Sequence, residues 1–64
     1  MYVIRNIKQG NYYDKTIKDV NHFVTYLDDA KKYSNKRDAN KDIKLFKHIE
    51  NFELVKYEEE DKNV

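Results

Sequence analysis

The sequence contains no cysteine, no proline and no tryptophan, and its single glycine is Gly10. Without cysteine the chain has neither a disulfide framework nor thiolate ligands for zinc. The two histidines, His22 and His48, lie far apart, and neither has a second histidine at helical spacing. The sequence therefore predicts no metal site and no cofactor.

Long apolar runs and catalytic groupings are also absent. No stretch approaches the roughly 20 apolar residues of a membrane-spanning helix, and residues 1–11 lack the apolar centre of a secretory signal. The only serine, Ser34, has no base and orienting acid at recognisable spacing. We therefore expect a cytoplasmic protein that is not an enzyme and does not contact membranes.

Charge and tyrosine are abundant. Charged residues form 39% of the 64 residues, and six residues are tyrosine, but the formal net charge is only +1. Residues 28–49 carry net +3 and residues 50–64 carry net −4, so a basic middle is followed by an acidic end. Only a quarter of the residues are large aliphatics or phenylalanine, which predicts a thin core.

Extended segments are predicted near both ends of the chain. Residues 2–8 are rich in β-branched and aromatic side chains and predict a strand. Gly10 and Asn11 tolerate positive φ and predict a hairpin turn before a return strand over 12–16. Residues 51–58 predict the last strand. Residues 17–25 fit a short third strand or an extended loop equally well.

Two helix starts lie between these strands. Thr25 and Asp28 form a variant of the capping box and predict a short helix over about 26–33. Asn35 and Asp38 repeat this pattern and predict a main helix over about 36–49.

The main helix is predicted to be amphipathic. At 100° per residue, one arc is apolar and comprises Ala39, Ile43, Leu45, Phe46 and Ile49. The opposite arc is basic and contains no acid. Asp42 lies at the apolar boundary, where we expect it to pair with a nearby lysine or to reach water.

These elements predict an α+β fold over residues 1–58. The economical packing is a small antiparallel sheet of three to four strands, with the helices on one face. The apolar arc of the main helix is expected to meet Phe52, Leu54 and some of Val3, Ile4 and Ile7. Residues 59–64 are predicted to be an acidic flexible tail, because they cannot offset their ordering entropy by burial.

Several motifs occur in an order that resembles a known group of proteins. They are Tyr2-Val3-Ile4, Gly10, Tyr12-Tyr13, Ala30-Lys31-Lys32-Tyr33, Asn35-Lys36-Arg37-Asp38-Ala39 and Phe52-Glu53-Leu54-Val55. Over about residues 2–58 the chain resembles small, mostly uncharacterised accessory proteins of phages and prophages of low-GC Gram-positive bacteria. The resemblance implies a non-enzymatic product in the cytoplasm of a bacterial host, which binds a host protein and inhibits a host or defence factor. It implies no catalytic residue.

The tyrosines predict where such a protein partner would bind. Tyrosine is enriched at interfaces because it buries a large area at low entropic cost. The candidate interface residues are Tyr2, Tyr12, Tyr13 and Tyr57, on an open face of the sheet. Alternation sends Tyr12 and Tyr13 to opposite sides, so at least one of them belongs to the core or an edge. The competing interpretation is that the tyrosines complete a poor core.

Two alternatives remain open. The basic arc of the main helix predicts salt-dependent nucleic-acid binding without sequence preference. Its candidate contacts are Lys36, Arg37, Lys41, Lys44 and Lys47. Against this alternative, only two residues are arginine, the side chain that most often contacts bases. The other alternative is a structural homodimer that pairs through a strand edge or the second face of the sheet.

Overall fold

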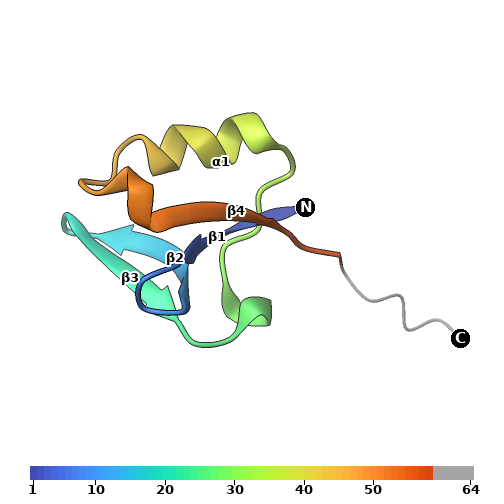
Figure 1. Ribbon diagram of the computed structural model, residues 1–64, viewed down its shortest axis with the longest axis horizontal. Coiled ribbons are helices and arrows are strands. Elements are labelled where there is room, and N and C mark those ends of the chain that lie inside the picture. Colours follow the sequence, from blue (N-terminus) through green and yellow to red (C-terminus); the bar gives the residue numbers. More distant parts are fainter. Residues whose placement is uncertain (59–64) are drawn as a thin grey trace, which may run out of the picture.

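The computed structural model describes residues 1–58, which form a four-stranded antiparallel sheet and one α-helix (Figure 1). The strands are β1 (Tyr2–Asn6), β2 (Asn11–Ile17), β3 (Val20–Val24) and β4 (Phe52–Lys56), in the order β3-β2-β1-β4. The helix is α1 (Lys36–Ile43), and the 3-10 turns are η1 (Leu27–Asp29) and η2 (Ile49–Asn51). The α+β prediction is confirmed. The predicted tail, residues 59–64, lies outside the described residues.

The inner strand β1 supplies the two largest fully buried side chains of the described residues, Val3 and Ile4. It pairs with β4 along its whole length, so that Val3 lies opposite Val55 and Ile4 opposite Leu54. Successive side chains of a strand point to opposite faces. Ile4 therefore joins the cluster under α1, whereas Val3 is buried on the other face. The sheet has apolar side chains to bury on both sides.

A tight turn between β2 and β3 shows which of the two structures predicted for residues 17–25 is present. Lys18 and Asp19 have φ of 51° and 64°, in the left-handed region that a two-residue hairpin of type I′ requires. This conformation costs a non-glycine residue about 1–2 kcal/mol. The turn nevertheless contains no glycine, so the usual sequence signal of such a hairpin is missing here. Residues 20–24 pair with β2 as a true third strand.

The segment before α1 passes between β1 and β2. These strands pair only through Arg5 with Tyr12 and Asn6 with Asn11, and then diverge. Residues 31–33 fill the gap. The Lys31 N–H donates to the Tyr13 carbonyl at 3.1 Å, and Tyr33 exchanges two backbone hydrogen bonds of 2.8 Å with Tyr2.

The predicted helix over 26–33 is therefore wrong. Only Leu27–Asp29 forms a 3-10 turn, because Ala30 and Tyr33 are buried in different layers rather than along one helical stripe. Nor do the helical elements share one face. The turn η1 lies on the side of the sheet opposite α1 (Figure 1). There the Tyr57 hydroxyl donates to an Asp28 carboxylate oxygen at 3.0 Å.

The main helix begins as the sequence predicts. The Asn35 side chain accepts from the Asp38 N–H at 2.9 Å, which satisfies one of the N–H groups at the helix start. The helix ends at Ile43 rather than at residue 49, because the next hydrogen bonds span three residues. The Leu45 N–H donates to the backbone carbonyl of Asp42 at 3.0 Å, and the Phe46 N–H donates to the backbone carbonyl of Ile43 at 2.9 Å.

This tighter turn divides the predicted apolar arc. A three-residue repeat places Phe46 beneath Ile43, against the sheet. Phe46 is only 8% exposed, whereas Leu45 is 81% and Ile49 52% exposed. The prediction that the apolar arc packs against the sheet is thus confirmed for Ala39, Ile43 and Phe46 and wrong for Leu45 and Ile49. Of the expected strand partners, Ile4, Phe52 and Leu54 face α1, Val3 faces away and Ile7 is exposed.

The short helix covers only part of the sheet. An eight-residue helix is about 12 Å long, and α1 packs over β1 and β4. The same face of β2 and β3 is approached instead by Phe46 and the residues that follow α1. This half of the sheet is the part that remains accessible.

Candidate functional site

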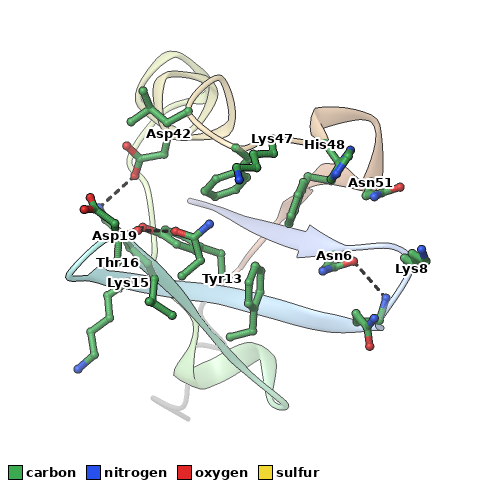
Figure 2. Close-up of a pocket in the computed structure, with 18 residues that line it drawn as sticks. Asn6, Lys8, Tyr13, Lys15, Thr16, Asp19, Asp42, Lys47, His48 and Asn51 are labelled. Atoms are coloured by element: carbon green, nitrogen blue, oxygen red, sulfur yellow. Dashed lines mark hydrogen bonds and ion pairs between the residues drawn. The ribbon is translucent and has the colours of Figure 1, made fainter.

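A groove of about 1150 Å³ lies between the β2–β3 hairpin and residues 44–48, which follow α1 (Figure 2). Its volume is slightly larger than that of a usual ligand pocket, about 300–1,000 Å³. The groove exists because α1 stops early and leaves the second half of the sheet uncovered. We call it the hairpin groove.

The floor of the hairpin groove is aromatic. The Phe46 ring lies 5.1 Å from Tyr13 and 4.6 Å from Phe52, measured between ring centroids. The Phe23 ring stacks on Phe52 at 5.9 Å and meets the edge of Tyr13 at 6.0 Å. Each such pair contributes about 0.5–1.5 kcal/mol beyond burial. Because Phe23 and Phe52 are only half-buried, this fixed floor presents apolar surface to the groove.

Two aliphatic side chains stand at the mouth of the groove. Leu45 is 81% exposed and Val20 is 60% exposed, and both line it. They come from opposite walls, Leu45 from the turn after α1 and Val20 from β3. Together with the aromatic floor they make up the apolar part of a lining that also contains many polar side chains.

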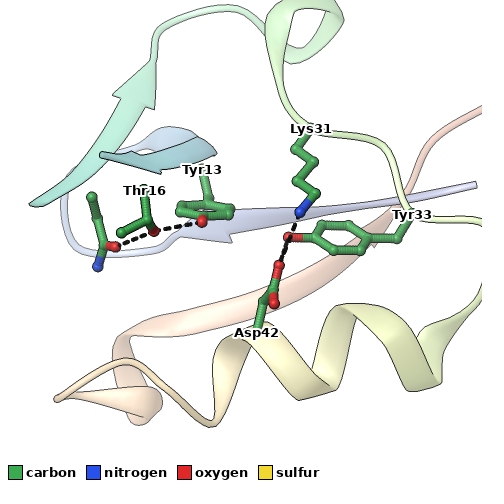
Figure 3. A network of polar contacts seen from close by, with 6 residues as sticks. Tyr13, Thr16, Lys31, Tyr33 and Asp42 are labelled. Atoms are coloured by element: carbon green, nitrogen blue, oxygen red, sulfur yellow. Dashed lines mark hydrogen bonds and ion pairs between the residues drawn. The ribbon is translucent and has the colours of Figure 1, made fainter. Parts of the chain in front are cut away.

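One wall of the groove is held by a chain of side-chain hydrogen bonds (Figure 3). The hydroxyls of Tyr13 and Thr16 lie 2.7 Å apart, and the Thr16 hydroxyl donates to Asn21 Oδ1 at 2.7 Å. This chain links β2 to β3 and fixes the orientation of the Tyr13 ring. The wall is therefore polar and ordered.

A second network joins α1 to residues 31–33, which pass between β1 and β2 (Figure 3). Asp42 Oδ2 accepts from the Tyr33 hydroxyl at 2.5 Å and from Lys31 Nζ at 3.2 Å. The lysine partner that the sequence led us to expect for Asp42 is thus present. Burial of Tyr33 raises the pKa of its hydroxyl above the ordinary value, and the hydrogen bond to Asp42 raises it further.

This raised pKa predicts a loss of stability at alkaline pH. Above pH 10.0 an unfolded tyrosine ionises while folded Tyr33 keeps its proton, so the unfolded state binds fewer protons. The free energy of unfolding should then fall by up to about 1.4 kcal/mol per pH unit. Tyr33→Phe should flatten that decline. Urea denaturation between pH 8 and roughly 11 measures it, and parallel pH curves for the two proteins would contradict the role of Tyr33.

The charges around the hairpin groove are predominantly basic. Lys31 is paired with Asp42, which leaves Lys8, Lys47 and Asp19 among the other charged residues that line the groove. Lys15 also borders the groove but extends away from it (Figure 2). A ligand with negative charge is therefore favoured at the rim.

The four tyrosines predicted as an interface do not share one surface. Tyr13 is 5% exposed and belongs to the groove floor, as the alternation argument required of one of the neighbouring pair. Tyr2 packs against the same cluster, and Lys36 Nζ lies 5.8 Å from the centre of its ring. Tyr12 and Tyr57 lie on the other face, where Lys32 Nζ is 4.9 Å from the Tyr57 ring.

The five predicted basic residues are all exposed, but they separate into three places. Lys36 lies over Tyr2, and Lys47 borders the groove. Arg37, Lys41 and Lys44 remain together on the outer side of α1. The continuous stripe expected from a helix over 36–49 is therefore shortened to three residues.

Sequence reasoning missed the groove residues Val20, Asn21 and Leu45. The sequence pattern places Leu45 in the core because it continues the helix past Ile43, where the helix of the structure ends. Asp42 was the one available signal, since an acid at an apolar boundary indicates a polar network nearby.

Within residues 1–58, no three histidine, aspartate or glutamate side chains are grouped closely enough to hold a metal ion. Across this same range, no helix has the length and apolar character to cross a membrane. Comparison of the chain with protein-family models, with curated proteins and with solved structures found no match.

Proposed function

We propose that this chain is a non-enzymatic binding protein that acts by protein–protein contact and receives a segment of its partner in the hairpin groove. The observation that carries this proposal is the apolar mouth above an aromatic floor, with Leu45 81% exposed. Leaving an aliphatic side chain in water forgoes about 1.5–3 kcal/mol of burial free energy, which a partner recovers on binding. Apolar pockets with ordered walls are the usual places for interface anchors.

The groove specifies the chemistry of the partner segment. Its floor accepts one large apolar or aromatic side chain, which would rest on Phe23 and Phe52 between Val20 and Leu45. Its rim favours acidic neighbours, because Lys8 and Lys47 have no acidic partner among the ion pairs of the described residues, against one unpaired acid, Asp19. We infer an acidic segment with an aromatic or aliphatic anchor.

The resemblance to phage and prophage accessory proteins supports a biological setting for this contact. In that setting the partner is a host or defence factor in the bacterial cytoplasm, and occupation of its acidic segment inhibits it.

Nucleic-acid binding through α1 is the weaker alternative. Arg37, Lys41 and Lys44 offer three neighbouring charges, and neutralising so few phosphates gives little affinity at physiological salt.

The groove proposal is tested with a library of short peptides that carry a fixed central tryptophan between glutamate and aspartate residues. Wild-type protein should bind this library, and a matched library with lysine flanks should bind about tenfold less. Leu45→Glu should weaken binding by a similar factor, because it places a like charge at the mouth. Fluorescence anisotropy gives both affinities.

Ile49→Glu serves as the matched control, since Ile49 is 52% exposed but does not line the groove. It should bind the acidic library as wild type does. Equal binding of the two libraries, equal weakening by both variants, or binding of a single-stranded DNA oligonucleotide in place of the peptides would each overturn the proposal.

A further inference from the structure

The two edges of the sheet, β3 and β4, differ in their charged residues. β4 carries Glu53 and Lys56, and charged side chains on an edge discourage the pairing of a further strand. β3 has the sequence VNHFV, without lysine, arginine, acid or proline. Val20 in this strand is 60% exposed, and Ile17 opposite it is 42% exposed. β3 therefore lacks the usual protection of an edge strand.

The turn before β3 fixes which backbone groups point outward. Ile17 and Val20 flank the two-residue turn and form a pair. In such a hairpin the flanking pair exchanges both of its hydrogen bonds, and the next pairs alternate. The N–H and C=O groups of Asn21 and Phe23 are thus directed to the outer edge, where a fifth strand would pair.

We propose that β3 pairs antiparallel with β3 of a second copy of this chain, around a two-fold axis at His22. The strand is self-complementary in this register, because its two ends are both valine. Val20 lies opposite Val24 of the second copy, and Asn21 lies opposite Phe23 of the second copy. Asn21 and Phe23 are the residues whose backbone groups face outward, so each pair closes two hydrogen bonds. The interface is isologous.

The charges beside β3 are compatible with a second copy. In the proposed register, the turn residues Lys18 and Asp19 fall opposite Tyr26 and Thr25 of the second copy, which carry no charge. Pairing also brings Val20, now 60% exposed, against a valine. The contact is five residues long on each side, smaller than a standard interface. Association is therefore weak and depends on protein concentration.

A single introduced cysteine tests this register, because the chain has no cysteine of its own. At the axis, the two copies of residue 22 form a non-hydrogen-bonded pair with Cα atoms about 4.5 Å apart, which is within disulfide range. Under mild oxidation, His22→Cys should give about tenfold more disulfide dimer than Ile49→Cys, an exposed position outside β3. Non-reducing gel electrophoresis measures the yield.

Val20→Cys tests whether the contact is in register. The two copies of residue 20 lie four residues apart along the paired strands, about 13 Å, so this variant should cross-link no more than Ile49→Cys. Adding Val20→Lys to His22→Cys should lower the dimer yield several-fold, since it places charge on the edge. Equal yields for His22→Cys and Ile49→Cys would overturn the proposal. Equal yields for His22→Cys and Val20→Cys would overturn it as well.

Discussion

Replacement of Phe46 by alanine should lower the free energy of unfolding by about 3–5 kcal/mol. Phe46 is 8% exposed and contacts both Tyr13 and Phe52, so its removal leaves a cavity at the centre of the aromatic cluster. A chain of this size has only about 3–5 kcal/mol of stability from a single core. We therefore expect Phe46→Ala to be largely unfolded at room temperature.

The neighbouring Leu45→Ala is the control. Leu45 is 81% exposed, so its loss should change stability by less than about 0.5 kcal/mol. Urea denaturation followed by far-UV circular dichroism gives both values. The pair is diagnostic because a helix over 36–49 would bury both side chains on one arc. A similar large loss for Leu45→Ala would contradict the end of α1 at Ile43.

Ile4→Ala should be the next most damaging substitution, with a loss of about 2–5 kcal/mol. Ile4 is fully buried in the central strand and lies between Leu54 on β4 and the helix residue Ala39. The same urea denaturation measures the effect.

Ile7→Ala provides the comparison for Ile4. The two isoleucines are three positions apart in sequence, but Ile7 lies past the end of β1 and is 49% exposed. Its truncation should cost under about 1 kcal/mol. If Ile7→Ala proved as damaging as Ile4→Ala, β1 would be placed wrongly in the sheet.

Local signals were the part of this fold that the sequence predicted well. The cap at Asn35 depends on a hydrogen bond to Asp38, three residues away, and both residues are visible in the sequence. The turn at Gly10 is similarly local, with φ of 73°. The apolar strands at both ends of the chain pair with each other as β1 and β4. The cap and the turn are decided by neighbouring residues and the strands by simple alternation, whereas the pairing of β1 with β4 joins distant parts of the sequence.

The features that the sequence did not predict depend on distant residues. No glycine or proline follows Ile43, so nothing local ends the helix. Its end is instead associated with the packing of Phe46 against Tyr13 and Phe52. The predicted helix at 26–33 failed for a similar reason, because Tyr33 pairs with Tyr2 between two diverging strands.

The hairpin groove shows why the candidate site was harder to predict than the fold. Its walls come from residues 13–23 and 42–52, and its existence depends on where α1 ends. The tyrosine pattern predicted an interface on the open sheet face, but η1 covers part of that face (Figure 1). Alternation along β2 did predict that at least one of Tyr12 and Tyr13 belongs to the core or an edge, and Tyr13 is buried in the groove floor.

The central claim is that α1 ends at Ile43, so that Phe46 turns into the aromatic cluster and leaves the β2–β3 half of the sheet open. Nuclear Overhauser contacts in solution test it most directly. We predict contacts from the Phe46 ring to the rings of Tyr13 and Phe52, and none from the Leu45 methyl groups to either ring. A continuous helical pattern of amide contacts through residue 49, with Leu45 methyl groups against Phe52, would contradict the claim.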